Sequence, residues 1–370
     1  MDIMEQALRA INGQNTNENA TMFAPTKGLG FHQFDGNTPI ADVLQQIGAN
    51  FTVRKDKLVR LPQDILEAAL RGESVTIKPE HIIGTHCATV REEDDKTISV
   101  VGNDYGVIQN TQGFEVMDLV TNSSVTGVPM SVVSAGLVHD FEPYVQVKMG
   151  DGARIDGDNS DTEFYCFFHN SHDGGSAMKL TFSTIRVICA NTFMMNMRSQ
   201  GLTFKHSKNV EKRIDLNDPE VQKRIIAKVQ ELHLMKDSYI ARMNSFRLAK
   251  VTDSDIDEYI TNLFMDSDEM KRIAREHNYK WEEISTDDIS QRMKNMIYSF
   301  KDTLESGIGQ DTNRGTKKWL FDGTTNFLSN TLNYGSTKDS EFTRATKRFD
   351  GLMAGKSNER MERAYALLAA

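Results

Sequence analysis

The sequence predicts an α+β fold, in which an antiparallel, β-rich N-terminal part is followed by a helical C-terminal part. Two patterns support this order. Up to residue 214, short runs of β-branched and aromatic residues alternate with turn-forming residues, whereas beyond it apolar residues recur at spacings of three and four. With 370 residues, 39% of them hydrophobic, the chain is long enough to bury a full core.

The chain divides into three expected parts. Residues 1–30 contain few large apolar side chains and many Asn, Thr and Gly, which is typical of a flexible arm. Residues 31–214 are expected to form a mixed α/β core around an antiparallel sheet. Residues 215–370 are expected to form a helical region.

The core is expected to begin with a short amphipathic helix from Pro39 to Ile47, capped by Thr38. Two β-type runs, residues 51–54 and 57–61, predict a hairpin that turns between them. Near-helical spacing of apolar residues predicts one helix over residues 112–123. The other β-type runs of this part cover residues 88–91, 97–101, 130–137, 144–149 and 164–169.

Helical periodicity dominates the C-terminal part. Asp218 followed by Pro219 is a strong helix-start signal, because Asp caps free N–H groups of the first turn and Pro fits the first helical position. Apolar residues then recur at threes and fours as far as Phe246, which predicts one long amphipathic helix. Further helices are expected over residues 256–264, 270–277, 287–304 and 341–353.

Composition restricts the class of protein. No apolar run approaches the roughly 20 residues of a membrane-spanning helix. The acidic, amide-rich start lacks the basic-then-apolar pattern of a secretory signal, so a cytoplasmic location without membrane partners is expected. Cys87, Cys166 and Cys189 are spaced too widely for a zinc clamp and are expected to be reduced core residues.

The segment from His169 to Phe193 is the most distinctive part of the sequence. Its portion from Asn170 to Gly175 has turn chemistry between two β-type runs, which favours a hairpin. In a second interpretation, the turn contributes to a cluster of hydrogen-bond donors for a phosphate or a base edge. That cluster would consist of His172, Asp173, Ser176, Arg186 and Asn191.

The same turn contains residue types that can bind a metal ion. His169 and His172 with Asp173 have suitable ligand chemistry, but side chains three apart on a strand point to opposite faces, so no metal is expected there. The acidic loop from Asp156 to Asp161 lacks the glycine and the glutamate of a calcium loop and is expected to be solvated. Phosphate-binding, dinucleotide-binding and hydrolase motifs are absent from the sequence, and no cofactor is expected.

Basic residues are concentrated in one segment although the net charge of the chain is −9. Between Gly174 and Ile214, seven basic residues occur with a single acid, Glu211, which gives this basic stripe a charge of +6. Phe193 and Phe204 lie in the same window, and interleaved aromatic and basic side chains suit unstacked bases and phosphates. Core packing explains the phenylalanines equally well. The basic residues are Lys179, Arg186, Arg198, Lys205, Lys208, Lys212 and Arg213.

Three blocks of sequence carry a family resemblance: Tyr105–Asn110, Asn170–Ala177 and Thr184–Thr192. In order and spacing they resemble the phage- and plasmid-type proteins grouped as domain of unknown function 932, although the first block lacks the proline of the family pattern. Arg314–Asn326 resembles the family's C-terminal block loosely. The resemblance implies a gene carried by a mobile element in a bacterial host, and it brings no reaction or catalytic residue with it.

These features predict a non-enzymatic protein that binds single-stranded nucleic acid, in the first place DNA, and anneals or protects strands during replication or recombination of a mobile element. Homo-oligomerisation is expected, because one stripe reaches only a few nucleotides. The expected binding residues are Arg186, Asn191, Phe193, Arg198, Phe204, Lys205, Lys208, Lys212 and Arg213.

Two alternatives remain open at this stage. One is a metal-dependent nuclease, for which His172 and Asp173 are weak catalytic candidates. The other is a non-catalytic structural or anti-host interaction protein.

Overall fold

An antiparallel sheet, here called sheet A, forms the centre of the protein. The computed structural model describes residues 24–187, 190–195, 202–264, 268–278, 288–353 and 355–370. Sheet A has the strand order β1-β5-β6-β8-β9-β10, with β7 paired to β8 and β11 paired to β9. Its strands are β1 (His32–Gln33), β5 (Met130–Val138), β6 (Glu142–Met149), β7 (Ala153–Arg154), β8 (Asp161–His169), β9 (Met178–Arg186), β10 (Asn191–Met195) and β11 (Leu202–Phe204).

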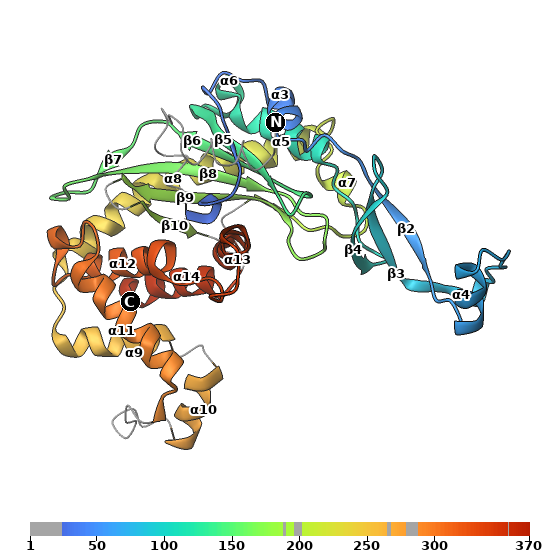
Figure 1. Ribbon diagram of the computed structural model, residues 1–370. Helices are drawn as coiled ribbons and strands as arrows, with labels where there is room; N and C mark the ends of the chain where they lie inside the picture. The colour runs from blue at the N-terminus through green and yellow to red at the C-terminus, as the bar shows by residue number, and fades with distance from the viewer. Residues whose placement is uncertain (1–23, 188–189, 196–201, 265–267, 279–287, 354) are drawn as a thin grey trace.

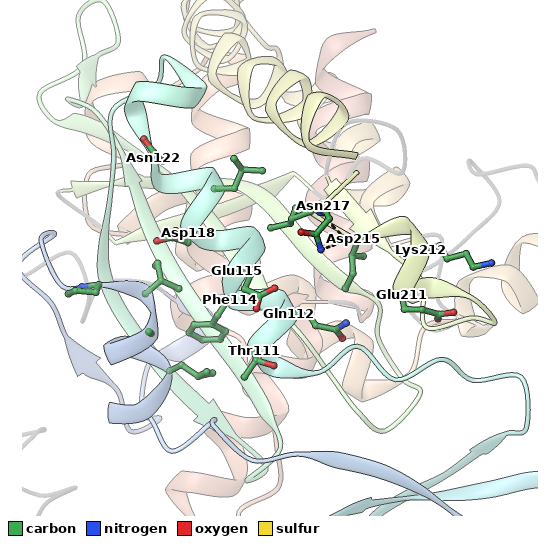
Figure 2. A pocket seen from close by; sticks show the side chains of 17 residues that line it. Thr111, Gln112, Phe114, Glu115, Asp118, Asn122, Glu211, Lys212, Asp215 and Asn217 are labelled. Carbon is green, nitrogen blue, oxygen red and sulfur yellow. Dashed lines mark hydrogen bonds between the residues drawn. The ribbon is translucent and has the colours of Figure 1, made fainter. Parts of the chain in front are cut away.

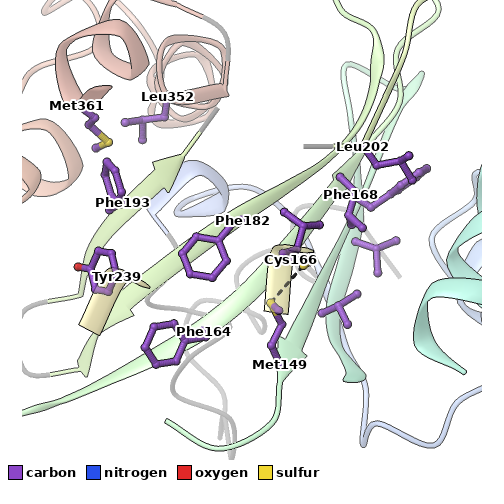
Figure 3. Packing of buried hydrophobic residues seen from close by; sticks show 14 of the residues in the cluster. Met149, Phe164, Cys166, Phe168, Phe182, Phe193, Leu202, Tyr239, Leu352 and Met361 are labelled. Carbon is purple, nitrogen blue, oxygen red and sulfur yellow. Dashed lines mark hydrogen bonds between the residues drawn. The ribbon is translucent and has the colours of Figure 1, made fainter. Parts of the chain in front are cut away.

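Both faces of sheet A are buried. On β8, Phe164, Cys166 and Phe168 belong to the larger apolar core, part of which Figure 3 shows. Helices α5 (Asn110–Thr121) and α8 (Pro219–Leu248) supply residues to this core. The alternate residues Tyr165 and Phe167 point to the opposite face and pack against α13 (Glu341–Met353). A strand covered on both sides needs a continuous apolar run, which explains the sequence of β8.

Helix α13 covers the second face of the sheet, whereas α12 (Lys317–Asn326) and α14 (Lys356–Ala369) lie at its β10 edge (Figure 1). The central helix of the helical part is α12, in which every residue from Lys318 to Asn326 is buried. Helices α12 and α14 pack against β10. The other helices are α3 (Ile40–Gln46), α6 (Ser123–Thr126), α7 (Val210–Arg213), α9 (Asp253–Phe264), α10 (Asp268–Glu276) and α11 (Gln291–Ser306).

A second sheet, β2-β3-β4, projects from this body with helix α4 at its tip (Figure 1). We call this unit the wing; it comprises β2 (Val53–Val59), α4 (Gln63–Leu70), β3 (Ile82–Arg91) and β4 (Lys96–Gly102). None of the α4 residues is buried. The wing carries many of the exposed large apolar side chains: Val59, Leu66, Leu70, Ile77, Ile82, Ile83 and Val100.

The fold class and most element positions agree with the sequence prediction. The long helix begins at Pro219, and the Asp218 side chain accepts a hydrogen bond from the Glu220 N–H. Two local predictions are wrong. Residues 51–61 form no hairpin, because β2 runs straight through Lys55 and Asp56 and pairs with β3. Thr38 does not cap α3, whose preceding residue is Pro39 and which has no side-chain cap.

The expected N-terminal arm and one of the three cysteines lie partly or wholly outside the described residues. Residues 1–23 of the expected arm lie outside the described residues, whereas Leu29 is buried against α13. Cys87 and Cys166 are buried free thiols, and Cys189 lies outside the described residues. Within the ranges described above, no helix combines the length and the hydropathy that a bilayer span requires.

Candidate functional site

The loop between β8 and β9 is buried in its first part and exposed at its tip, Gly174 and Gly175. His169 pairs with Lys179 across the two strands, so the predicted hairpin is confirmed. However, Asn170, Ser171 and His172 are each 0% exposed. A loop with buried polar groups must find hydrogen-bond partners within the protein, and the neighbouring elements supply them.

The partners of this loop come from the start of α5 and from the wing. The Asn110 Oδ1 atom lies 2.9 Å from His172 Nε2 and accepts a hydrogen bond of 3.1 Å from Asn170 Nδ2. The Thr89 hydroxyl donates to the His172 carbonyl at 2.9 Å, and Tyr105 donates to the Ser171 carbonyl at 3.1 Å. We call these residues the polar junction. Two of the sequence blocks behind the family resemblance therefore meet here.

His172 is held neutral in the polar junction. Burial, with a contribution from the nearby His206, lowers the pKa of His172 to about 3. Asn110 Nδ2 donates to the Ala49 carbonyl, which orients Asn110 Oδ1 as an acceptor for His172 Nε2–H. The lone pair of the neutral ring is then on Nδ1, which is buried and has no hydrogen-bond partner within the described ranges.

Asp173 belongs to the same loop but has other partners. Its Oδ1 atom accepts hydrogen bonds from Ser171 Oγ at 2.5 Å and from the Gly175 N–H at 2.7 Å. Ser171 Oγ also lies 2.8 Å from Glu142 Oε1. Among the described residues, the group with metal-ligand spacing is a different one, His139, Glu142 and Asp350.

Arg186 lies far from the polar junction, so the predicted donor cluster does not form. Arg186 pairs with Thr162 at the far end of β9, whereas Lys179 marks the end near His169. At about 3.3 Å per residue, the seven steps along the strand from Lys179 to Arg186 place the two ends roughly 23 Å apart. Asn191 is the β10 neighbour of Arg186 and lies at the same far end.

Arg186 is instead part of a buried ion-pair network. Its guanidinium contacts both carboxylate oxygens of Asp158, at 3.0 Å from Nε and 2.5 Å from Nη2. Lys318 Nζ lies 3.1 Å from Asp158 and 2.6 Å from Asp322. The side chains of these four residues are at most 6% exposed. The expectation of a solvated loop at Asp156–Asp161 is therefore wrong for Asp158.

The charges in this network stabilise one another. Burial acts to raise the pKa of Asp158, but the hydrogen bonds from Arg186 and the positive charges of Lys318 and Arg186 outweigh it. The pKa of Asp158 is therefore below its usual value. The network joins the loop before β8, strand β9 and helix α12, which fixes the sheet to the helical part.

The two phenylalanines of the basic stripe are core residues. Phe193 is 2% exposed and packs against Tyr239, Phe321 and Tyr365. Phe204 is 4% exposed. Neither ring offers a face to a nucleic-acid base, which corrects the assignment of both as stacking residues. Arg198 lies outside the described residues.

The other cations of the stripe lie together at the surface. Lys205, Lys208 and Lys212 are exposed, and Arg213 is half-buried with its guanidinium on the Lys205 carbonyl at 2.8 Å. Arg224 of α8 contacts the Arg213 carbonyl at 2.5 Å. We call these five residues the basic ridge. It follows the segment from β11 through α7 and reaches the second turn of α8.

A groove of about 1030 Å³ lies beside the ridge, between α3, α5 and the segment after α7. Figure 2 shows its lining, with Glu211 and Lys212 at one rim. Ile40, Leu44 and Phe114 contribute apolar surface. Its acids disfavour a phosphate, because they outnumber the basic groups; they are Glu115, Asp118, Glu211 and Asp215.

Comparison with known proteins identifies the family. A family model described as a domain of unknown function, DUF932, matches residues 97–353. The chain belongs to the DUF932 family. The DUF932 region begins in β4 and ends with α13, so it contains the ion-pair network and the basic ridge, whereas β2 and β3 of the wing precede it. No curated protein and no solved structure matches the chain.

Proposed function

We propose that this DUF932 protein binds nucleic acid through the sugar-phosphate backbone, along the basic ridge. The observation that carries the proposal is the pairing state of the five ridge cations. In the described part of the chain, no carboxylate lies within ion-pair distance of any of them. Some other surface cations are paired, for example Arg91 with Asp94 at 2.7 Å and Arg272 with Glu276 at 2.6 Å.

The two arginines of the ridge are positioned in advance of binding. Arg213 donates to the Lys205 carbonyl and to Ser207 Oγ, and Arg224 donates to the Arg213 carbonyl. A guanidinium has five N–H groups, so such anchoring leaves others available for phosphate oxygens. Anchoring also reduces the side-chain entropy that binding would otherwise cost.

The ridge supports backbone recognition without base reading. The buried rings of Phe193 and Phe204 remove the stacking contribution, and phosphate contacts carry no sequence information directly. Single strands are the expected form, since a flexible strand can follow a short, curved row of cations. A role in replication or recombination of a mobile element, and association of several copies to lengthen the ridge, follow as parts of the same proposal.

The test is fluorescence-anisotropy binding of labelled single- and double-stranded oligonucleotides over a salt series. The variant Lys205→Ala/Lys208→Ala/Lys212→Ala removes three exposed cations, and Lys250→Ala/Lys271→Ala/Lys356→Ala is the control with the same change in net charge. We expect the ridge variant to bind at least about tenfold more weakly at low salt. The slope of log affinity against log salt concentration should become shallower by about two, because each lost phosphate contact contributes roughly 0.7.

Two outcomes would contradict the proposal. One is the absence of binding by the wild type at low salt. The other is an equal loss in the ridge and control variants, because that would assign the effect to overall charge.

A further inference from the structure

The turn between β5 and β6 holds two side chains in an unusual arrangement. Val138 pairs with Glu142, so residues 139–141 form the turn. His139 and Asp140 have φ values of 53° and 64°, a left-handed conformation that non-glycine residues adopt infrequently. This backbone brings His139 Nε2 to 3.9 Å from Glu142 Oε2.

A third side chain reaches the same point from the far end of the sequence. Asp350 of α13 places its Oδ1 atom 3.3 Å from His139 Nε2. One ligand atom from each of His139, Glu142 and Asp350 lies within 4.8 Å of the others. Four ligand atoms around a tetrahedral ion with bonds of about 2.0–2.1 Å are roughly 3.3 Å apart, so small rotations suffice to bring this group to ligand geometry.

A fourth group faces this cluster and lacks a partner. His169, at the end of β8, is 3% exposed, and neither of its ring nitrogens has a hydrogen-bond partner among the described residues. Its Nε2 atom lies 3.9 Å from Glu142 Oε2, and its ring contacts the ring of Phe349, the neighbour of Asp350. A buried imidazole without a partner is costly, because it loses water and gains no hydrogen bond in return.

We propose that His139, Glu142 and Asp350 bind a divalent transition-metal ion, with His169 as the fourth ligand or as the partner of a metal-bound water. Imidazole and carboxylate together favour zinc or manganese over magnesium, which prefers oxygen ligands. The His139 and Asp350 side chains are 32% and 56% exposed, so one side of the site is open to entry from solvent.

The bound ion would fasten α13 to the sheet. His139, Glu142 and His169 belong to sheet A and its turn, whereas Asp350 belongs to the helix that covers the second face of that sheet. Metal binding would therefore stabilise the docking of α13, in addition to the apolar contacts of Ala345, Phe349 and Met353.

The test is isothermal titration of the full chain, after treatment with a chelator, with Zn²⁺, Mn²⁺ and Mg²⁺ in turn. We expect one equivalent of Zn²⁺ or Mn²⁺ to bind more tightly than Mg²⁺, with a rise in the thermal unfolding midpoint. Asp350→Asn and Glu142→Gln should abolish this binding, and His169→Leu should weaken it about 10- to 100-fold. Asp140→Asn is the matched control, since Asp140 is an exposed acid of the same turn that pairs with Lys96.

The proposal fails if neither Zn²⁺ nor Mn²⁺ binds to the wild type, or if Asp350→Asn and Asp140→Asn bind the ion equally well. Because Asp350 is exposed, its variant is expected to fold, and circular dichroism of Asp350→Asn checks this directly.

Discussion

Sheet A carries a buried polar cluster at each of its two ends, and the two clusters differ in how completely their groups are paired. At one end, Asp158 contacts both Arg186 and Lys318, and Lys318 also contacts Asp322. At the other end, both ring nitrogens of His169 and the Nδ1 atom of His172 have no hydrogen-bond partner in the part of the chain that the structure describes.

The difference separates the end that holds the sheet to the helical part from the end where we propose that a ligand binds. A buried ion pair with satisfied partners resists change, because removing one member leaves the other uncompensated. Buried groups without partners are rare in native proteins and require an explanation, such as an ion or another ligand. The network at Arg186 is accordingly structural, and the end with His169 is the better place to look for a ligand.

Disrupting the ion-pair network around Asp158 should have the largest effect on the free energy of unfolding. Asp158→Asn leaves Arg186 and Lys318 buried without their shared carboxylate, and we expect it to lower the free energy of unfolding by about 3–5 kcal/mol. Urea unfolding measures this loss. Arg154→Ala is the control. Its ion pair with Asp161 is exposed, so this substitution should leave the urea midpoint nearly unchanged. Similar midpoints for both variants would show that the network does not stabilise the contact between the sheet and the helical part.

Lowering the pH should destabilise the protein through His172, at the end of the sheet whose groups are incompletely paired. Unfolded histidine binds a proton near pH 6.5, whereas native His172, with a pKa of about 3, does not. The unfolded state therefore binds more protons below pH 6.5, and stability falls as the pH decreases, by about 1.4 kcal/mol per pH unit for this residue. Between pH 6.5 and 5 the loss amounts to about 2 kcal/mol.

The measurement is urea unfolding at several pH values. His172→Gln should reduce the slope of the profile between pH 6.5 and 5, whatever its effect at pH 7, and the part of the slope that comes from His206, whose pKa burial lowers to about 4, should remain. His86→Gln, on an exposed residue of β3, serves as the control and should keep the wild-type slope. If the two variants have the same slope, His172 is not the residue that is held neutral.

The smallest effect on the free energy of unfolding is expected from a substitution of His169, because this side chain has no hydrogen bond to lose. In the metal-free protein, His169→Leu replaces an unpartnered buried imidazole by an apolar side chain, so the free energy of unfolding should change by less than about 1 kcal/mol, or rise. Urea unfolding in the presence of a chelator measures this change. A loss as large as that of Asp158→Asn would mean that His169 has a structural partner after all, and the contrast between the two ends would disappear.

Three strands of sheet A, β5, β6 and β8, were predictable because their sequence pattern is local. Residues 130–137, 144–149 and 164–169 combine β-branched and aromatic side chains, and each run lies inside an observed strand. The hairpin error at residues 51–61 has a tertiary cause. Lys55 and Asp56 resemble turn residues, but Lys55 donates to the carbonyls of Asn103 and Tyr105, which satisfies its charge within a strand.

Helix α12 was missed because its polar residues are buried. Lys318 and Asp322 interrupt any apolar stripe, and the segment therefore looks like a solvated loop. The i,i+4 spacing of Lys318 and Asp322 allows them to pair, but it does not indicate that both are buried, because the contact of Lys318 with Asp158 joins residues far apart in the sequence. The same reason explains why Arg186 was assigned to the surface.

The candidate sites show the same limit. The sequence predicts the position of the basic stripe, and three of its lysines are exposed, but it does not separate them from the buried Arg186. The pairing of His139 with Asp350 spans 211 residues and has no sequence signal at all. A histidine in a short turn next to a glutamate is too common to single out.

The position of α13 also constrains how the chain folds during translation. The strands of sheet A end at Phe204, but the helix that covers their second face starts at Glu341. A ribosome that adds about 5–20 residues per second needs roughly 7–30 s to synthesise the intervening segment. During that interval Tyr144, Tyr165 and Phe167 are not covered by a helix, so the nascent protein presents an aromatic surface to chaperones until α13 emerges.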